Sequence, residues 1–430
     1  MATLGQGASP VERPRGSGIA SDRLGIGFRP FGWPMVLSTE AQTPHGDPMS
    51  KIEHVETTIL DIPTIRGHVL SMTTMTVQSV VLVRIRFGDG SEGWGEGTAI
   101  GGMSYGSESP ESIRLAIDAY ITPAITGMDG DDINAVTHRV EKLVRGNPIA
   151  RCAVETALWD GLGRRLGVSV AQLFGGPVRE TMPVAWTLAS GHSETDIDEA
   201  RKMIAARRHN IFKLKIGKRA LRDDLAHVGA IKSALGDAAS IRVDVNQAWN
   251  VTEARHGLRG LQEIGVDLVE QPIAARFHKS LGHLSDAYEI AVMADEALQG
   301  PEDAMRVAAE RSADVFAVKI AQSGGLKRAA EVVAIAQSAG IGIYGGTMLE
   351  AGIGTAAAVQ LFSTVERLGW GTELFGPLLM KDEILASPIE YRDFSLVRPQ
   401  GPGLGVVPDP EKIACYDRDA RRVLRSVAGE

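Results

Sequence analysis

The chain has 430 residues, of which 44% are hydrophobic and 23% are charged, and its formal net charge is −8. This composition is that of an ordinary globular protein, long enough for two or three domains. An acidic chain without a cluster of Lys or Arg is a poor candidate for nucleic-acid binding. No apolar run approaches the roughly 20 residues that cross a bilayer, so we expect no membrane partner. Two cysteines, Cys152 and Cys415, are too few for a disulfide framework, and we expect a cytoplasmic protein.

Residues 1–48 are rich in Gly, Pro and Ser and show no sustained hydrophobic period, so we predict a disordered N-terminal extension. The patterned sequence begins at Met49. An alternative is that translation starts there and that the first 48 residues do not belong to the native protein. Peptides from this segment in mass spectra of the native protein would contradict that alternative.

Residues 49–176 have the pattern of an α+β domain. Residues 52–97 alternate and are rich in β-branched side chains, and Asp89-Gly90 is a good hairpin turn, so we predict an antiparallel sheet. Apolar residues then recur at three- and four-residue spacing in three predicted helices, 110–125, 132–144 and 150–167. The breaker at 175–177 ends this domain, which we expect to cap the next one.

Residues 177–376 alternate between strand and helix patterns. The strand-like runs are rich in Val, Ile and Ala, as expected of parallel strands with both faces covered. Eight of them are predicted: 182–190, 210–217, 240–247, 266–272, 290–296, 315–321, 341–346 and 368–376. The fold class predicted is therefore α/β, a (β/α)8 TIM-like barrel. Residues 377–430 have strand and turn character, and we expect them to return to the capping domain.

Charged residues recur near the ends of these strand-like runs. Lys213 and Lys215 are two residues apart in IFKLKIG, so both side chains point to the same face of one strand. Four more charged residues follow Lys215 at intervals of 29, 26, 25 and 24 residues: Asp244, Glu270, Asp295 and Lys319. That interval is about one strand plus one helix of a barrel in which roughly 250 residues make eight units. The sequence therefore predicts an active site at the carboxyl ends of the strands.

Three carboxylates without a nearby His or Cys are hard oxygen ligands, which suit Mn²⁺ or Mg²⁺ and suit zinc poorly. We predict that Asp244, Glu270 and Asp295 bind such an ion. Asp295 and Glu296 point to opposite faces of their strand, and the apolar frame around them favours Asp295 as the ligand. Glu296 is then free to support a lysine.

A lysine acts as a base only when its pKa falls well below the usual value, and a second ammonium group nearby has that effect. Lys213 is placed to have this effect on Lys215. The reaction that suits this set is proton transfer at a carbon next to a carboxylate, with a cation near the enolate oxygens. Lys319 reaches the site from the opposite side, as a second base or as an electrostatic partner.

The motifs KLKIG, DVNQAW, VEQPI, ADEAL and VKIAQSGG resemble those of the enolase superfamily. The segments WTLASG, YGGTMLEAGIGT and WGTELFGPLL resemble those of its muconate cycloisomerases, the muconate-lactonising enzymes of aromatic degradation. The similarity extends from residue 50 to about 405. It implies conversion of cis,cis-muconate to muconolactone through a metal-stabilised enolate, in catechol degradation by the β-ketoadipate pathway.

The resemblance also implies roles for single residues. It assigns the metal to Asp244, Glu270 and Asp295, and the α-proton to Lys215 with Lys319 opposite it. Glu373 is implied as the acid on the last strand, and Tyr105 with the segment 63–68 closes the pocket from the capping domain. Ile100, Ala317 and Phe375 resemble positions of enzymes for unsubstituted muconate and, with Asn246, are expected to contact the substrate. By resemblance, the protein is a homo-oligomer, often an octamer, acting on a small dicarboxylate.

The resemblance has gaps and leaves alternatives. Relatives commonly read KNGGP after the lysine of the sixth strand, where this chain has QSGGL at 322–326, and Gly352 follows Ala351 in a variable loop. These differences leave the chemistry intact but blur the substrate. The alternatives are chloromuconate cycloisomerisation, racemisation or epimerisation of an acylamino acid or dipeptide, and dehydration of a sugar acid. An alternative from another class is a metal-binding barrel without catalysis.

Overall fold

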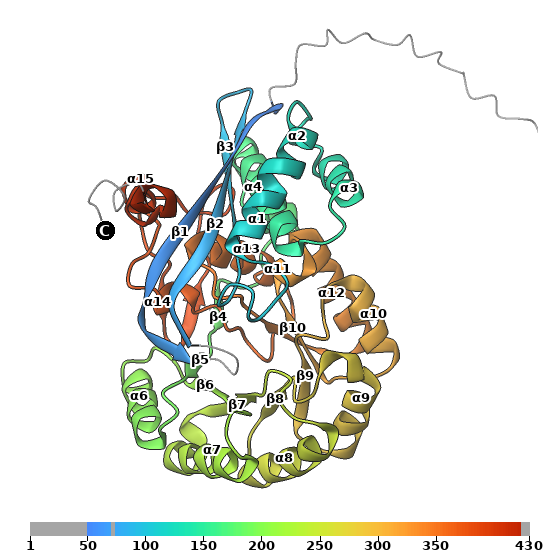
Figure 1. The fold of residues 1–430 in the computed structure, drawn as a ribbon, viewed down its shortest axis with the longest axis vertical. Helices are drawn as coiled ribbons and strands as arrows, with labels where there is room; N and C mark the ends of the chain where they lie inside the picture. Colours follow the sequence, from blue (N-terminus) through green and yellow to red (C-terminus); the bar gives the residue numbers. More distant parts are fainter. Residues whose placement is uncertain (1–49, 70–73, 423–430) are drawn as a thin grey trace, which may run out of the picture. The chain divides into compact units, whose positions relative to one another are not determined.

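The computed structural model describes residues 50–69 and 74–422. The predicted tail 1–48 and the alternative start at Met49 lie outside the described residues. The chain first forms a three-stranded antiparallel sheet (Figure 1), which confirms the prediction for residues 52–97. Its strands are β1 (Ile52–Val69), β2 (Thr74–Phe87) and β3 (Glu92–Thr98). The ladder between β1 and β2 shifts register between Pro63 and His68, so the end of β1 bulges.

Helices follow this sheet, and the longest of them packs on β3. They are α1 (Pro110–Ala116), a π-helical turn η1 (Ile117–Ile121), α2 (Thr122–Ile125), α3 (Ile133–Leu143), α4 (Pro148–Leu166) and α5 (Val170–Leu173). A Cβ at Gly95 would lie 1.9 Å from the carbonyl oxygen of Ala153, and one at Gly93 would lie 2.0 Å from that of Ala157. The glycines of β3 therefore let α4 approach the backbone of the sheet directly.

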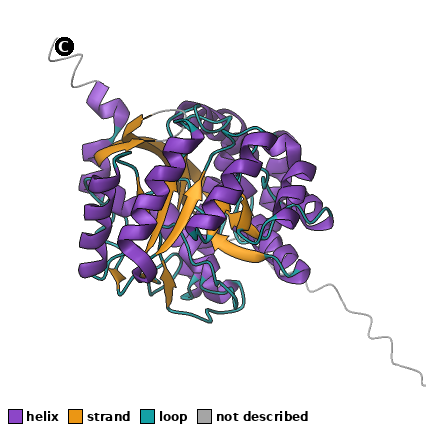
Figure 2. Ribbon diagram, turned by 90° about the horizontal axis from the view of Figure 1, so that it is seen from below, coloured by secondary structure: helices purple, strands orange, loops and turns teal. Residues whose placement is uncertain are grey.

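The second layer is a parallel sheet of seven strands in sequential order from β5 to β11. The strands are β5 (Trp186–Leu188), β6 (Ile211–Lys215), β7 (Ser240–Asp244), β8 (Leu268–Glu270), β9 (Ala291–Ala294), β10 (Val315–Val318) and β11 (Gly342–Gly345). The α-helices that alternate with them are α6 (Ser193–Ala205), α7 (Leu221–Leu235), α8 (Val251–Ile264), α9 (His278–Ala287), α10 (Pro301–Ala309), α11 (Ile320–Ser323), α12 (Leu326–Ala339) and α13 (Gly352–Phe362). Two 3₁₀ turns, η2 (Gly236–Ala238) and η3 (Ala275–Phe277), complete the connections. In Figure 2 the strands occupy the interior and helices surround them.

The eighth predicted strand, 368–376, is not a regular strand. Thr372 makes isolated bridges to Val184 and to Gly345, and so joins β11 to the residues just before β5. The physical reason is local: Gly371 has a φ of 67°, which turns the backbone out of the extended conformation immediately before the bridge. The ring of parallel pairings is thus closed by single bridges rather than by a regular eighth strand.

The C-terminal segment consists of short elements. The predicted first strand, 182–190, splits into β4 (Thr181–Pro183) and β5, and β4 pairs with the C-terminal hairpin in a sheet of order β12-β13-β4. The remaining elements are α14 (Gly376–Leu379), β12 (Tyr391–Arg392), β13 (Ser395–Val397) and α15 (Pro410–Tyr416). Leu60 of β1 forms a bridge with Asp417, so this segment contacts the first sheet. The domain boundaries at 176 and 376 stay predictions.

The interior of the barrel has an apolar layer beneath its charged mouth. Alternate strand residues form a small buried cluster of Leu268, Met293, Val315, Ala317 and Tyr344. The guanidinium of Arg242 lies 5.2 Å from the ring centroid of Tyr344. This filled interior places the chemistry at the carboxyl ends of the strands, as in other barrels. No helix in the described part of the chain is long and apolar enough to cross a membrane.

Candidate active site

A small cavity at the carboxyl ends of the barrel strands contains all seven of the predicted charged residues. It is lined by Lys213, Lys215, Asp244, Glu270, Asp295, Lys319 and Glu373, and by His68, Ile100, Tyr105, Thr347 and Leu349. A larger cavity of about 620 Å³ lies against the first sheet, between Arg84, Trp94 and Val407, and contains none of the predicted residues. We therefore locate the candidate site in the smaller cavity, because only there do the titratable groups converge.

Lys213 lies deepest in the site. Its Nζ donates to Glu373 Oε2 at 2.5 Å and to Glu270 Oε2 at 3.0 Å, and lies 3.4 Å from Asp244 Oδ2. Burial alone would lower the pKa of Lys213, but attraction by Glu270, Glu373 and Asp244 outweighs it and holds the pKa well above its usual value. Lys213 therefore stays charged and acts as a fixed cation at the base of the pocket.

Lys215 follows on the same face of β6, as the two-residue spacing predicts. Its Nζ donates to Asp244 Oδ2 at 2.5 Å and to Asn246 Oδ1 at 3.2 Å. Burial opposes ionisation of Asp244, yet Lys215 and Lys213 outweigh it and lower the pKa of that carboxyl group to about 2. The side chain of Lys215 is 14% exposed against 2% for Lys213, so Lys215 is the lysine of β6 that a substrate can reach.

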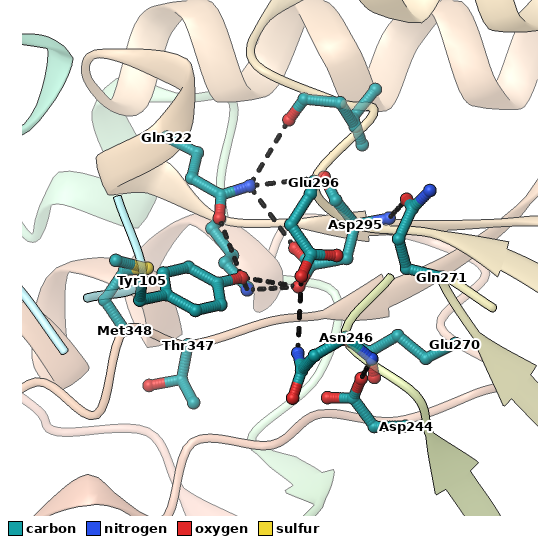
Figure 3. Close-up of polar contacts among 12 residues, drawn as sticks. Tyr105, Asp244, Asn246, Glu270, Gln271, Asp295, Glu296, Gln322, Thr347 and Met348 are labelled. Atoms are coloured by element: carbon teal, nitrogen blue, oxygen red, sulfur yellow. Dashed lines mark hydrogen bonds and ion pairs between the residues drawn. The ribbon is translucent and has the colours of Figure 1, made fainter. Parts of the chain in front are cut away.

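Lys319 approaches from the opposite wall, at the end of β10. Its Nζ donates to Asp295 Oδ2 at 2.7 Å and to the hydroxyl of Tyr105 at 2.9 Å, and Tyr105 itself donates to Asp295 Oδ2 at 2.7 Å. In Figure 3 the Tyr105 ring projects from the capping domain toward the Asp295 carboxylate. The capping domain thus supplies one member of a closed hydrogen-bonded triangle in the barrel mouth.

Asp295 and Glu296 have different hydrogen-bond partners, although the charges of both act on Lys319. Asp295 lines the cavity, whereas Glu296 Oε1 accepts from Asn246 Nδ2 at 3.3 Å (Figure 3). That Glu296 supports a lysine stays a prediction: its hydrogen-bond partner is the amide of Asn246, while its charge helps to raise the pKa of Lys319. Gln271 holds this turn in place, since its Oε1 accepts from the backbone N–H groups of Asp295 and Ala297.

The predicted metal ligands lie together, but each is paired with an ammonium group. Accordingly, within residues 50–69 and 74–422 no three His, Cys, Asp or Glu side chains are arranged as a formed metal site. Five carboxyl groups nevertheless face three ammonium groups here: Asp244, Glu270, Asp295, Glu296 and Glu373 against Lys213, Lys215 and Lys319.

This excess of negative charge affects the pKa of Glu270. Burial, together with repulsion by Asp244, Asp295 and Glu373, raises the pKa of Glu270 well above its usual value. One divalent cation would balance the two surplus carboxylates, and an all-oxygen donor set suits a hard ion. The residues present therefore fit a divalent metal.

Some of the predicted substrate-contacting residues lie at the cavity and others do not. Ile100 and Tyr105 line the cavity, and Asn246 touches Lys215 beside it. Ala317 does not line the cavity: it shares a face with Lys319 but lies one layer deeper, in the apolar cluster of the barrel interior. Phe375 is buried behind the wall, where its ring lies 6.4 Å from that of His68.

The sequence singled out no individual role for three residues in or beside the pocket. His68 was included only within the segment 63–68, and a bulge in β1, invisible to periodicity, directs it inward. Gln322, noted only as a departure from relatives, donates through Nε2 to Asp295 Oδ1 at 3.3 Å. Thr347 lines the cavity, and its hydroxyl donates to the buried carboxylate of Glu350.

Comparison with known proteins places the chain in a family. Residues 54–175 match the mandelate racemase / muconate lactonizing enzyme N-terminal domain, and residues 196–412 match the enolase C-terminal domain-like family. The chain belongs to the mandelate racemase / muconate lactonizing enzyme family. Membership of this enolase-superfamily family implies a divalent metal. This agrees with the excess of negative charge in the pocket.

Several relatives within the family are identical to this chain at about half of the aligned residues. Muconate cycloisomerase 1-2 of Acinetobacter lwoffii is 55% identical over 86% of this chain and 97% of its own length. Muconate cycloisomerase 1 of Pseudomonas putida is 48% identical over 85% of this chain and 98% of its own length. A crystal structure of muconate lactonizing enzyme from Pseudomonas fluorescens complexed with muconolactone superposes with a TM-score of 0.85. It is 51% identical and covers 86% of this chain and all of its own chain.

Proposed function

We propose that this chain catalyses the cycloisomerisation of cis,cis-muconate to muconolactone, a step of aromatic degradation. The main structural support is the pair of lysines on opposite walls of one pocket. Lys215 ends β6 and Lys319 follows β10, and three strands separate β6 from β10 in the sheet. A flat substrate between them presents one face to each ammonium group, while acids close the base of the pocket.

The reaction is an internal addition in which no atom is gained or lost. An oxygen of one substrate carboxylate forms a bond to the near carbon of the far double bond. The π-electron pair of that double bond moves toward the second carboxylate, giving an enolate. The Lys215 ammonium then donates its proton to the adjacent carbon, and the reverse reaction uses Lys215 as the base.

The acids and the second lysine support this step electrostatically. Mn²⁺ or Mg²⁺ held by Asp244, Glu270 and Asp295 would supply positive charge where the enolate develops. Lys319, held by Tyr105 and Asp295, faces the other side of the substrate. Glu373 is anchored by Lys213 at 2.5 Å and lines the pocket, as expected of an acid in the substrate cavity.

Unsubstituted muconate is favoured over chlorinated muconates. The muconate cycloisomerases compared are 48–55% identical to the chain, whereas the chloromuconate cycloisomerase of Cupriavidus pinatubonensis is 42% identical. Ile100 in the pocket wall agrees with this preference. Comparing kcat/KM for muconate and 2-chloromuconate tests it, and a higher value for the chlorinated substrate would reverse the assignment.

The activity is tested by the loss of diene absorbance when muconate is added with Mn²⁺. Lys215→Ala should reduce kcat by at least about 100-fold, the lower range for a general acid or base. Lys218→Ala is the matched control, because Lys218 is exposed on the loop that follows β6. A Lys215→Ala protein with wild-type turnover would exclude the assignment. We also expect a homo-oligomer in the cytoplasm, which light scattering and cell fractionation would test.

A further inference from the structure

The end of β1 is tied to the barrel directly beside the pocket. Between Pro63 and His68 the strand leaves its ladder with β2, and the bulge carries Arg66 onto β5 and α6. Figure 1 shows the end of β1 reaching down to these elements. Bulges commonly redirect a side chain near an active site.

Arg66 makes three contacts across this junction. Its Nη2 donates to the carbonyl of Thr187 at 2.9 Å and to Glu199 Oε1 at 3.3 Å, and its guanidinium lies 5.7 Å from the ring centroid of Trp186. Trp186 Nε1 donates to the same Glu199 oxygen at 2.9 Å. Arg66, Glu199 and Trp186 therefore form one connected unit, which we call the β1 latch.

The β1 latch leads to the pocket through Phe375. The ring of Phe375 lies 5.0 Å from that of Trp186 and 6.4 Å from that of His68. His68 is only 2% exposed and lines the cavity that contains Lys215. Its Nδ1 is buried without a hydrogen-bond partner in the described structure. A buried polar atom without a partner is costly, so an unpaired nitrogen in a cavity wall points to a ligand.

His68 is uncharged in the pocket and can therefore act as a neutral hydrogen-bond donor. Burial, with the nearby positive charges of Lys215, Arg66 and Lys213, lowers the pKa of His68 to about 3. A neutral imidazole carries one N–H and can offer it from Nδ1. The pocket already holds three ammonium groups, so an uncharged donor adds direction to carboxylate binding without adding another buried charge.

From these contacts we propose that His68 binds a substrate carboxylate through Nδ1 and that the β1 latch positions it for this task. The proposal rests on the proposed function insofar as the ligand is a dicarboxylate. His68 is then a binding residue that sets affinity for the substrate's carboxylate end. Arg66, Glu199 and Trp186 are positioning residues that act through it.

The first experiment compares His68→Phe with His68→Asn. Phe keeps the ring beside Phe375 without a donor, whereas Asn places an amide near the position of Nδ1. We expect His68→Phe to raise KM for muconate by about 10- to 100-fold with a smaller change in kcat, the effect of losing a hydrogen bond to a charged group. His68→Asn should recover part of that loss. Melting temperatures of both variants equal to that of the wild-type protein would exclude unfolding as the cause of the change in KM.

The second experiment tests the β1 latch. Glu199→Gln keeps an acceptor for Trp186 but removes the charge that faces Arg66, and it should raise KM by several-fold. The double variant with His68→Phe should be no worse than His68→Phe alone, because the latch acts only through His68. Asp393→Asn is the matched control: Asp393 pairs with Arg207, which lies over the Phe394 ring, and none of these three lines the cavity. Additive effects of Glu199→Gln and His68→Phe would overturn the positioning role.

Binding of adipate, a saturated dicarboxylate of the same length, separates this inference from the proposed function. Calorimetry should show a dissociation constant weakened by His68→Phe and partly restored by His68→Asn, whether or not muconate is turned over. If wild-type protein converts muconate while His68→Phe leaves both KM and adipate affinity within twofold, the His68 assignment fails and the proposed function stands. If adipate binding depends on His68 but muconate is not converted, the proposed function fails alone.

Discussion

Lys213 and Glu373 form a close ion pair in the barrel mouth, with Nζ 2.5 Å from Oε2, although they come from opposite ends of the barrel sequence. The same ammonium group holds Glu270 at 3.0 Å. One buried cation thus keeps two buried carboxylates together. Its removal leaves both without compensation, which is far more costly than losing an exposed pair.

Lys213→Met should therefore destabilise the protein by about 3 to 5 kcal/mol, the usual result of breaking a buried ion pair. Lys215→Met is the control. Lys215 is more exposed, and its partner Asp244 would still have the Lys213 ammonium group 3.4 Å away after the substitution. Urea denaturation of both variants measures the difference. Equal midpoints would show that Lys213 has no special structural role.

Removal of divalent metal should abolish turnover and lower the melting temperature. Two surplus carboxylates remain in the pocket when the three lysines have been paired, and a bound cation stabilises the folded state by mass action. Dialysis against EDTA followed by titration with Mn²⁺ or Mg²⁺ should restore both activity and melting temperature, and Zn²⁺ should restore activity poorly. Full activity in protein shown to be metal-free by mass spectrometry would contradict the assignment of Asp244, Glu270 and Asp295.

The charged core of the site was predictable because strand geometry is local. Lys213 and Lys215 share a face whatever surrounds them, and the even spacing of Asp244, Glu270 and Asp295 reports the barrel repeat. Ala317 shows the limit of that reasoning. The alternation of strand side chains predicts which face of β10 carries Ala317, but not how far below the barrel mouth it lies, and that depth decides whether it contacts substrate or the apolar core.

Contacts between distant segments were not predictable. His68 reaches the pocket because β1 bulges and because Arg66 pairs with Glu199, which lies 133 positions later in the chain. The eighth strand was wrong for a local reason, the positive φ of Gly371, but the bridges that Thr372 makes to Val184 and Gly345 exist only in the closed ring. Pairings of this kind depend on the assembled fold rather than on a period in the sequence.

Tyr105→Phe should reduce kcat while leaving the protein folded. The hydroxyl is the second acceptor of Lys319 and a donor to Asp295, so its loss leaves the ammonium group less constrained. A hydrogen bond to a charged group contributes about 1.5 to 3 kcal/mol, which corresponds to a loss of about 10- to 100-fold if it is felt in the transition state. Tyr120→Phe is the control, because Tyr120 is 61% exposed on η1. Unchanged kinetics for Tyr105→Phe would remove Tyr105 from the site.

Gly325→Ala should destabilise the junction between the capping domain and the barrel. Gly325 has a φ of 141°, and a Cβ there would lie 1.9 Å from Glu155 Oε2, which accepts from Leu326 N–H at the start of α12. Strain and the displaced cap together predict a loss of about 2 to 4 kcal/mol.

The control for that variant is Gly340→Ala. Gly340 ends the same helix at a φ of 73°, but nothing lies within 4 Å of an added Cβ. It should cost about 1 kcal/mol, the conformational penalty without the collision. Thermal denaturation would compare the two, and an equal loss in both would show that the contact with Glu155 is not important.

Glu96 should make stability fall as pH rises. It lies on β3 with 3% exposure and accepts from the backbone N–H groups of Ala351 and Gly354, both at 2.7 Å, at the start of α13. Burial, helped by the charge of Glu350, raises the pKa of Glu96 from 4.5 to about 7. The unfolded chain releases this proton near pH 4.5 and the folded chain near pH 7, so the folded state binds more protons between these values.

The stabilising contribution of protonated Glu96 is therefore complete below pH 4.5 and is lost as pH rises to 7, by an amount on the order of 3 kcal/mol. Glu96→Gln should be less stable at low pH, because its amide cannot accept from both N–H groups, but its stability should change less between pH 4.5 and 7. Buried Glu155 and Glu383 also have pKa values raised to about 7, so the informative quantity is the difference between wild type and variant. Glu53→Gln, on the exposed side of β1, should leave the wild-type curve unchanged. Parallel curves for wild type and Glu96→Gln would show that Glu96 does not take up a proton on folding.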